Sequence, residues 1–100
     1  MKTTVNLFGA NFQIEIKKST YAMGNAIVLE AVDSETGDPF GMITVNGPGI
    51  SLGPDEICVK TYSENEWVLQ LLTLLPNNFK DTGKSVEIGF ATAPIWQFKQ

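Results

Sequence analysis

The clearest pattern in the chain is a helical repeat of apolar positions shortly after its middle. The apolar residues that recur at helical spacing are Trp67, Val68, Leu71, Leu72 and Leu75. Ser63 and Glu66 precede this run in the S-x-x-E order of a capping box, and Pro76 follows it. The pattern predicts one helix over about residues 64–75, whose wide apolar side should pack on one face of a sheet.

Alternation of apolar and polar residues predicts antiparallel strands. In the run FQIEIKK the aromatic and isoleucine side chains would face one side and the polar side chains the other, which is typical of a half-buried strand. The strands expected before the helix are Thr3–Phe8, Phe12–Lys18, Asn25–Asp33, Phe40–Val45 and Glu56–Tyr62. The first two should form a hairpin. Residues 34–39 form a tight connection with Gly37 at a positive φ, so the first four strands should form a meander.

The chain after the helix is harder to assign. Asn77–Ser85 reads as a polar loop, and Val86–Phe90 and Ala93–Phe98 read as one bent strand or two short ones. Pro94 cannot donate a ladder hydrogen bond, which predicts an edge or a bulge there and makes that edge a candidate for self-association. The expected fold is therefore α+β. One domain over 1–100 would hold an antiparallel sheet of five to six strands with a single helix on one face.

Composition removes several classes of chemistry. The chain has no histidine and a single cysteine, Cys58, so it can form no histidine-based triad, no zinc cluster and no intramolecular disulfide. Cys58 should be a partly buried strand residue on the face of Glu56 and Lys60. We therefore expect no metal and no cofactor. Paired carboxylates are the catalytic groups that remain possible for an enzyme, and Asp33, Glu35 and Asp38 lie together in one turn. Turns also favour aspartate for local hydrogen bonding, which is the structural explanation for these acids.

Charge and hydropathy also limit the partners. The net charge is −4, from 7 basic and 11 acidic residues, which argues against a general nucleic-acid binder. No apolar run approaches the roughly 20 residues of a membrane span, and the first residues lack a signal-peptide pattern. A cytoplasmic protein without a membrane partner is expected, as a monomer or a small homo-oligomer.

Two non-enzymatic alternatives are the binding of a small ligand and the binding of single-stranded nucleic acid. The loop Asn46–Asp55 holds three glycines and two prolines and could close over a small ligand, although it lacks the spacing of a phosphate-binding loop. Aromatic side chains on an open sheet face could stack on single-stranded nucleic acid. The candidates are Phe12, Tyr21, Phe40, Phe90, Trp96 and Phe98, most of which also suit a core.

Several segments together resemble a known family. They are Val5–Gly9, Asn25–Leu29, Asp33–Phe40, Ile43–Asn46, Val59–Glu66, Thr82–Gly83 and Gly89–Ile95. The resemblance is to a family of small uncharacterised proteins encoded by phages, plasmids and integrative elements of Firmicutes and related bacteria. It spans nearly the whole chain and carries no catalytic residues. It implies an accessory protein of a mobile element, of the kind that often binds and blocks host defence machinery.

These observations favour a non-enzymatic protein that binds a host or element-encoded protein stoichiometrically. The predicted contact residues are acids near the helix start with one tyrosine beside them: Asp55, Glu56, Tyr62, Glu64 and Glu66. Local roles compete with this assignment, because Glu66 suits a capping box and Glu64 suits the positive end of the helix dipole.

Overall fold

The computed structural model describes residues 1–7, 9–20, 27–45, 52–61 and 65–100. The elements in chain order are β1 Lys2–Leu7, β2 Ala10–Thr20, β3 Ile27–Asp33, β4 Pro39–Met42, β5 Glu56–Cys58, α1 Trp67–Thr73, β6 Phe79–Ile88 and β7 Ala91–Phe98. The α+β class and the four-stranded antiparallel meander β1-β2-β3-β4 are confirmed. Gly37 has a φ of 78°, as the tight connection between β3 and β4 requires.

The strands divide between two sheets, where the sequence predicted one sheet of five or six strands. The second sheet has the order β5-β7-β6. Next to the ends of β4 and β5, Thr44 pairs with Val59 in an isolated antiparallel bridge, which links the two sheets. The Thr44 hydroxyl is buried and accepts the backbone N–H of Leu29 at 3.1 Å. Two sheets rather than one give α1 an apolar surface on each side.

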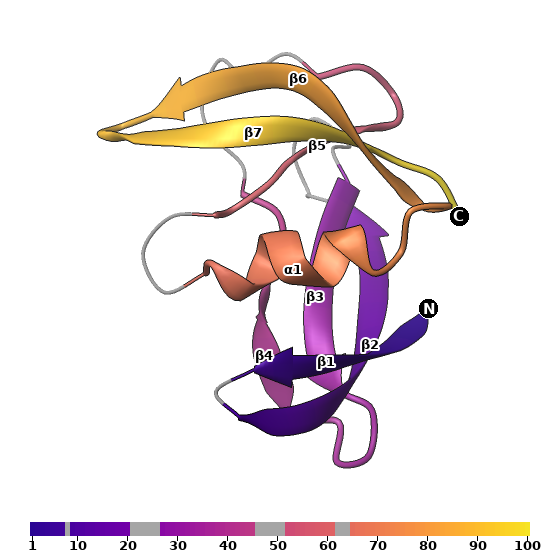
Figure 1. Ribbon diagram of the computed structural model, residues 1–100. Helices are drawn as coiled ribbons and strands as arrows, with labels where there is room; N and C mark the ends of the chain where they lie inside the picture. The colour runs from indigo at the N-terminus through magenta and orange to yellow at the C-terminus, as the bar shows by residue number, and fades with distance from the viewer. Residues whose placement is uncertain (8, 21–26, 46–51, 62–64) are drawn as a thin grey trace.

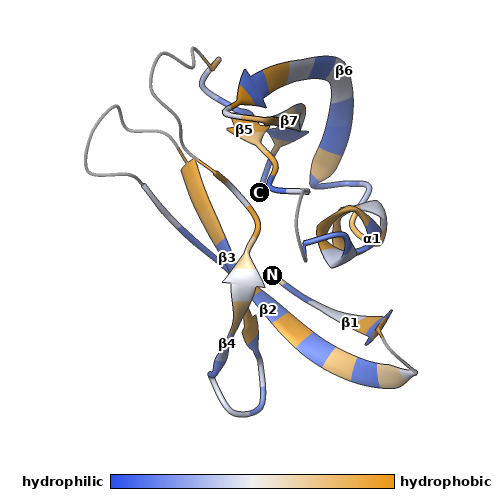
Figure 2. Ribbon diagram, turned by 90° about the vertical axis from the view of Figure 1, so that its left-hand side faces the viewer, coloured by the Kyte–Doolittle hydropathy of each residue, from blue (hydrophilic) through white to orange (hydrophobic). Residues whose placement is uncertain are grey.

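The helix lies between the two sheets (Figures 1 and 2). Val68, Leu71 and Leu72 are fully buried, and Trp67 and Leu75 pack against the same core, as the helical pattern predicted. The core residues from the strands and their connections are Val5, Leu7, Ile14, Ile16, Leu29, Ala31, Ile43, Ile57, Val59, Phe79, Trp96 and Phe98. One core, with the short helix α1 in it, therefore joins both sheets.

The helix is shorter than the predicted span of 64–75. It begins at Trp67, so Glu66 occupies the N-cap position and makes no side-chain capping bond, instead of lying inside the helix as a capping box requires. Ser63 lies outside the described residues. Asn65 holds the helix start, because its side chain donates to the Met42 carbonyl at 2.8 Å and its carbonyl accepts from Val68.

The segment predicted as a polar loop, Asn77–Ser85, is mostly strand. It forms the first part of β6, which pairs with β7 from Phe79 onward. The alternation was hidden because the register shifts between Asp81 and Lys84, and because only Phe79 in this stretch is buried. A strand that has a neighbouring strand on one side only, and whose side chains mostly face water, needs few apolar residues.

Pro94 was predicted to mark an edge or a bulge. β7 is the central strand of its sheet, so the edge position is wrong, but the register shift between Asp81 and Lys84 lies opposite Trp96 and Ile95, next to Pro94. The last register pair between β5 and β7 is Cys58 with Ile95. Pro94 is the next residue along β7, and its carbonyl accepts the N–H of Val59 at 2.9 Å. The ladder thus ends where the proline has no N–H to donate, which lets a central strand contain it.

Candidate functional site

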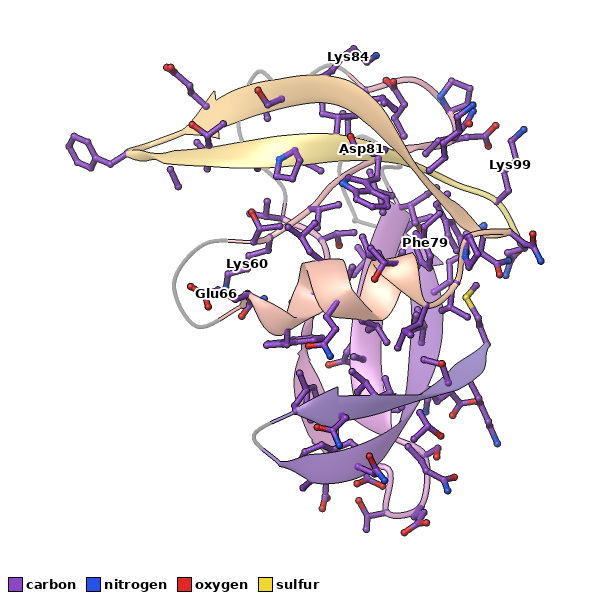
Figure 3. All side chains as sticks on the ribbon, in the orientation of Figure 1. Lys60, Glu66, Phe79, Asp81, Lys84 and Lys99 are labelled. Atoms are coloured by element: carbon purple, nitrogen blue, oxygen red, sulfur yellow. The ribbon has the colours of Figure 1, made fainter. Side chains whose placement is uncertain are left out.

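The structure separates the acids that the sequence grouped as a contact site. Asp55 is exposed in the turn before β5 and lines a hollow together with Lys99. Glu66 is exposed at the start of α1, and Figure 3 shows it on the opposite side of the molecule from Lys99. Tyr62 and Glu64 lie outside the described residues. Asp55 and Glu66 therefore do not share one continuous surface.

Glu56, the third acid of that group, is engaged within the protein. One of its carboxylate oxygens accepts the N–H of Gly53 at 2.8 Å, and the other is ion-paired with the ammonium of Lys84 in β6. Its side chain is 19% exposed. The hydrogen bond from Lys84, followed by the one from Gly53, lowers the pKa of the Glu56 carboxyl below its ordinary value of 4.5. Glu56 thus links the start of β5 to β6, the strand at the opposite edge of the same sheet.

This lowered pKa predicts a specific pH dependence. A carboxyl whose pKa is lower in the folded state stabilises the fold above its unfolded pKa, and this contribution is lost as the pH falls through the folded value. We expect Glu56→Gln to lower the urea midpoint at neutral pH and to converge with the wild type below pH 4.5. Lys84→Met should do the same. A constant difference between Glu56→Gln and wild type at every pH would contradict the role given to the ion pair.

Of the carboxylates considered for catalysis, that of Asp33 stabilises a turn. One oxygen of Asp33 accepts the backbone N–H groups of Glu35 at 2.8 Å and Thr36 at 3.1 Å. This confirms the local hydrogen-bonding interpretation for Asp33. Cys58 is buried more completely than predicted, at 1% exposure, and burial raises the pKa of its thiol. The thiol therefore stays protonated at neutral pH, in the form that is not nucleophilic.

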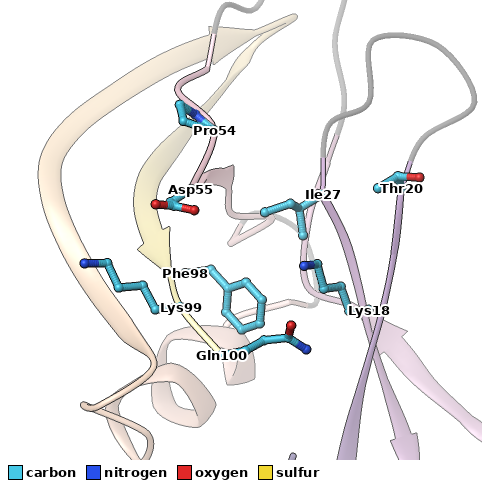
Figure 4. A pocket seen from close by; sticks show the side chains of 8 residues that line it. All are labelled: Lys18, Thr20, Ile27, Pro54, Asp55, Phe98, Lys99 and Gln100. Carbon is cyan, nitrogen blue, oxygen red and sulfur yellow. The ribbon is translucent and has the colours of Figure 1, made fainter.

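A hollow of about 420 Å³ lies between the two sheets (Figure 4). Ile27 and Phe98 form its apolar floor, and the ammonium of Lys18 lies 6.0 Å from the centroid of the Phe98 ring. Figure 4 shows Lys99 turned away from the hollow. The volume suits a small ligand, but most of the lining is polar, whereas ligand pockets are mainly apolar. The hollow offers one ammonium beside an aromatic ring and little enclosure.

The aromatic side chains do not form one stacking surface. Trp96 and Phe98 belong to the core, as most of these residues were expected to, and Tyr21 lies outside the described residues. Phe40 packs edge-on between Phe12, at 5.4 Å between ring centroids, and Trp67, at 4.9 Å. The rings of Phe12, Phe40 and Trp67 therefore pack against one another and do not form an open surface for base stacking. Phe90 is the exception, and its position differs from all the others.

Phe90 is fully exposed, with a relative accessibility of 113%. The β6–β7 hairpin closes with the pair Ile88 and Ala91, which leaves Gly89 and Phe90 as a two-residue turn. Gly89 has a φ of 60°, the positive value that such turns require at their first position. The hairpin extends beyond the rest of its sheet in Figure 1. The largest exposed apolar side chain among the described residues therefore stands at the end of a projecting hairpin.

The face of the hairpin beside this turn is apolar. Val86 pairs with Ala93 and Ile88 pairs with Ala91, so these side chains share one face, and all except buried Ala93 are half-buried. We call Val86, Ile88, Phe90 and Ala91 the hairpin tip. The sequence analysis named Phe90 as a possible stacking residue but placed it at the end of a strand, and so missed the turn that exposes it. The signal was Gly89, because a Gly-X pair between two alternating runs predicts a turn.

Comparisons of the chain with protein-family models, with curated proteins and with solved structures find no match. Within the described ranges no helix is long and apolar enough to cross a membrane. The same residues bring no three His, Cys, Asp or Glu side chains into a group that could hold a metal ion. Function is therefore inferred from the chain's own geometry, in which the hairpin tip is the most distinctive surface.

Proposed function

We propose that the protein is a non-enzymatic binding module of a mobile element that engages a protein partner through the hairpin tip. The observation that carries this proposal is the complete exposure of Phe90 at the end of a projecting hairpin. Leaving an aromatic ring in water forgoes about 1.5–3 kcal/mol of burial free energy. A partner pocket that receives the ring recovers this free energy.

The chemistry around Phe90 favours a protein over a nucleic acid. Binding hot spots are enriched in large side chains that fill a pocket, with near-neutral contacts around them. Val86, Ile88 and Ala91 supply such contacts. A single-strand binder needs lysines near its stacking ring, but Lys84, the lysine nearest to Phe90 in the hairpin sequence, is ion-paired with Glu56.

The resemblance to proteins of phages and other mobile elements supports a host defence protein as the partner and the cytoplasm as the place of action. The net charge of −4 would speed association with a basic partner. The exposed carboxylates of Asp55 and Glu66 stay candidates for contacts at the rim of such a complex. In this proposal the Phe90 ring contributes most of the binding free energy, and the carboxylates orient the approach of the partner.

The experiment is a quantitative pull-down from bacterial lysate with tagged wild type, Phe90→Ala and Leu74→Ala, read by mass spectrometry. We expect wild type to recover one host protein near stoichiometrically and Phe90→Ala to bind it at least tenfold more weakly, about 1.4 kcal/mol. Leu74→Ala is the matched control, because Leu74 is 46% exposed on a different element. Both variants should melt close to wild type. Equal recovery by wild type and Phe90→Ala would refute the anchor.

Sequestration of a small ligand is the second candidate, and the hollow beside Lys18 favours it. Native mass spectrometry of the purified protein would detect a retained small molecule as extra mass beyond a whole multiple of the 10.9 kDa chain. Under this alternative an anionic adduct should be present in wild type and absent in Lys18→Met. Protein without any adduct, in wild type as in the variant, would leave the hairpin tip as the site.

A further inference from the structure

β6 presents a long unpaired edge. It has ten residues and lies at the end of the sheet order β5-β7-β6, and no described strand pairs with its outer side (Figure 2). The register shift between Asp81 and Lys84 distorts its first half, which is a common way to protect an edge. Beyond that shift the pairing with β7 is regular from Lys84 to Ile88. This second half is the segment open to another strand.

The other edges of the two sheets offer less. β4 has four residues and β5 has three. β1 has six residues, but the helix covers part of it, because the side chain of Gln70 donates to the carbonyl of Asn6 at 3.0 Å. The segment Lys84–Ile88 therefore combines regular geometry with free backbone groups, and an exposed edge of that kind pairs readily with a further strand.

The backbone direction along this edge follows from Pro94. Its carbonyl accepts the N–H of Val59 on the β5 side, so the polar backbone atoms of Pro94 point away from β6. Ser85 lies opposite Pro94 and is therefore in a non-hydrogen-bonded pair. Because these pairs alternate along an antiparallel ladder, the N–H and C=O groups of Ser85 and Glu87 point outward. Those of Val86 point toward β7.

We propose that two copies of this chain pair antiparallel through Lys84–Ile88, about a two-fold axis at Val86. Ser85 of each copy then lies opposite Glu87 of the other, and both residues point their free backbone groups across the interface. Each Ser85–Glu87 pair exchanges both of its backbone hydrogen bonds. The pairing joins the two three-stranded sheets into one of six strands. A second copy is the natural occupant, since it brings the same free edge.

Side chains select this register. Val86 faces Val86 of the second copy in a non-hydrogen-bonded pair, where β-branched side chains come closest. Lys84 faces Ile88, and no like charges are opposed. Centring the axis on Lys84 or on Glu87 would oppose two like charges, and centring it on Ser85 would extend the ladder into the distorted region at Gly83. The turn with Phe90 lies just outside the ladder at each end, so the Phe90 ring of each copy stays available to a partner, while Val86 and Ile88 lie within the ladder.

The test is the mass of the purified, untagged protein in solution, by light scattering after size exclusion and by sedimentation equilibrium over a range of concentrations. We expect wild type at twice 10.9 kDa and Ser85→Pro at 10.9 kDa. Ser85→Pro removes an outward N–H without removing a bond to β7, which an edge strand tolerates. Ser85→Ala keeps that N–H and should stay dimeric.

A second variant guards against loss of folding. Val86→Lys places two ammonium groups opposite each other at the axis and should give monomers with an unchanged circular dichroism spectrum. Wild type at 10.9 kDa at every concentration would overturn the proposal, as would dimers unaffected by both Ser85→Pro and Val86→Lys. Phe90→Ala should leave the dimer intact. Failure of this pairing is therefore distinct from failure of the anchor in partner binding.

Discussion

Leu71→Ala will lower the free energy of unfolding by about 2–5 kcal/mol. Leu71 is fully buried on α1, and its side chain belongs to the core that joins the two sheets. Truncation removes the burial free energy of three carbon atoms and leaves a cavity. The helix is held at both ends, through Asn65 at its start and through Leu75, whose carbonyl accepts the N–H of Phe79. It therefore cannot easily move inward to fill that cavity.

Leu69→Ala is the matched control for this prediction. It makes the same chemical change on the same helix at a side chain that is 39% exposed. We expect urea unfolding, followed by circular dichroism, to give Leu69→Ala a loss well under half of that for Leu71→Ala. Similar losses for the two variants would mean that α1 contributes helical content but does not join the sheets as the structure has it.

The parts of the fold that could be predicted are those with local signals. The β1–β2 hairpin follows from a short strand, a glycine turn and the alternation that begins at Phe12, and the connection before β4 follows from Gly37 at a positive φ. The buried side of α1 follows from the spacing of Val68, Leu71 and Leu72. Each of these features depends on residues close to one another in the sequence.

The parts that could not be predicted depend on distant residues. The two sheets meet at the bridge between Thr44 and Val59, and neither residue type predicts a change of sheet at that point. β6 was missed because its polar face and its register shift remove the alternation that marks a strand. The start of α1 was misplaced because Asn65 donates to the carbonyl of Met42, a partner 23 positions away. Tertiary contacts here override local capping preference.

The candidate site shows the same division. Glu56 was grouped with neighbouring acids by sequence proximity, but its partner Lys84 is 28 positions away. Phe90 could have been found from the Gly89–Phe90 pair, had the two flanking runs been read as a hairpin. Exposure of an aromatic residue is otherwise invisible in a sequence, because the same residue type most often marks a core. The surface that we propose to be functional was therefore the part of the molecule least predictable from the sequence pattern alone.

Gly41→Ala is the second large effect on stability that we expect. A Cβ at position 41 would lie 2.6 Å from the Cζ2 atom of Trp67, well inside the sum of the van der Waals radii. The indole cannot retreat freely, because the Phe40 ring packs against it edge-on at 4.9 Å between centroids. Overpacking of this kind costs about 1–3 kcal/mol. The free energy of unfolding should therefore fall by that amount in Gly41→Ala.

A double-mutant cycle with Trp67→Phe isolates the clash from any backbone effect of the added methyl group. Phenylalanine lacks the outer ring atoms that the Cβ would meet, so Gly41→Ala should cost much less when position 67 is phenylalanine. Equal costs in both backgrounds would show that the contact between β4 and the start of α1 is looser than 2.6 Å implies. A reduced cost would establish that Gly41 is required because β4 lets the first turn of α1 approach its backbone directly.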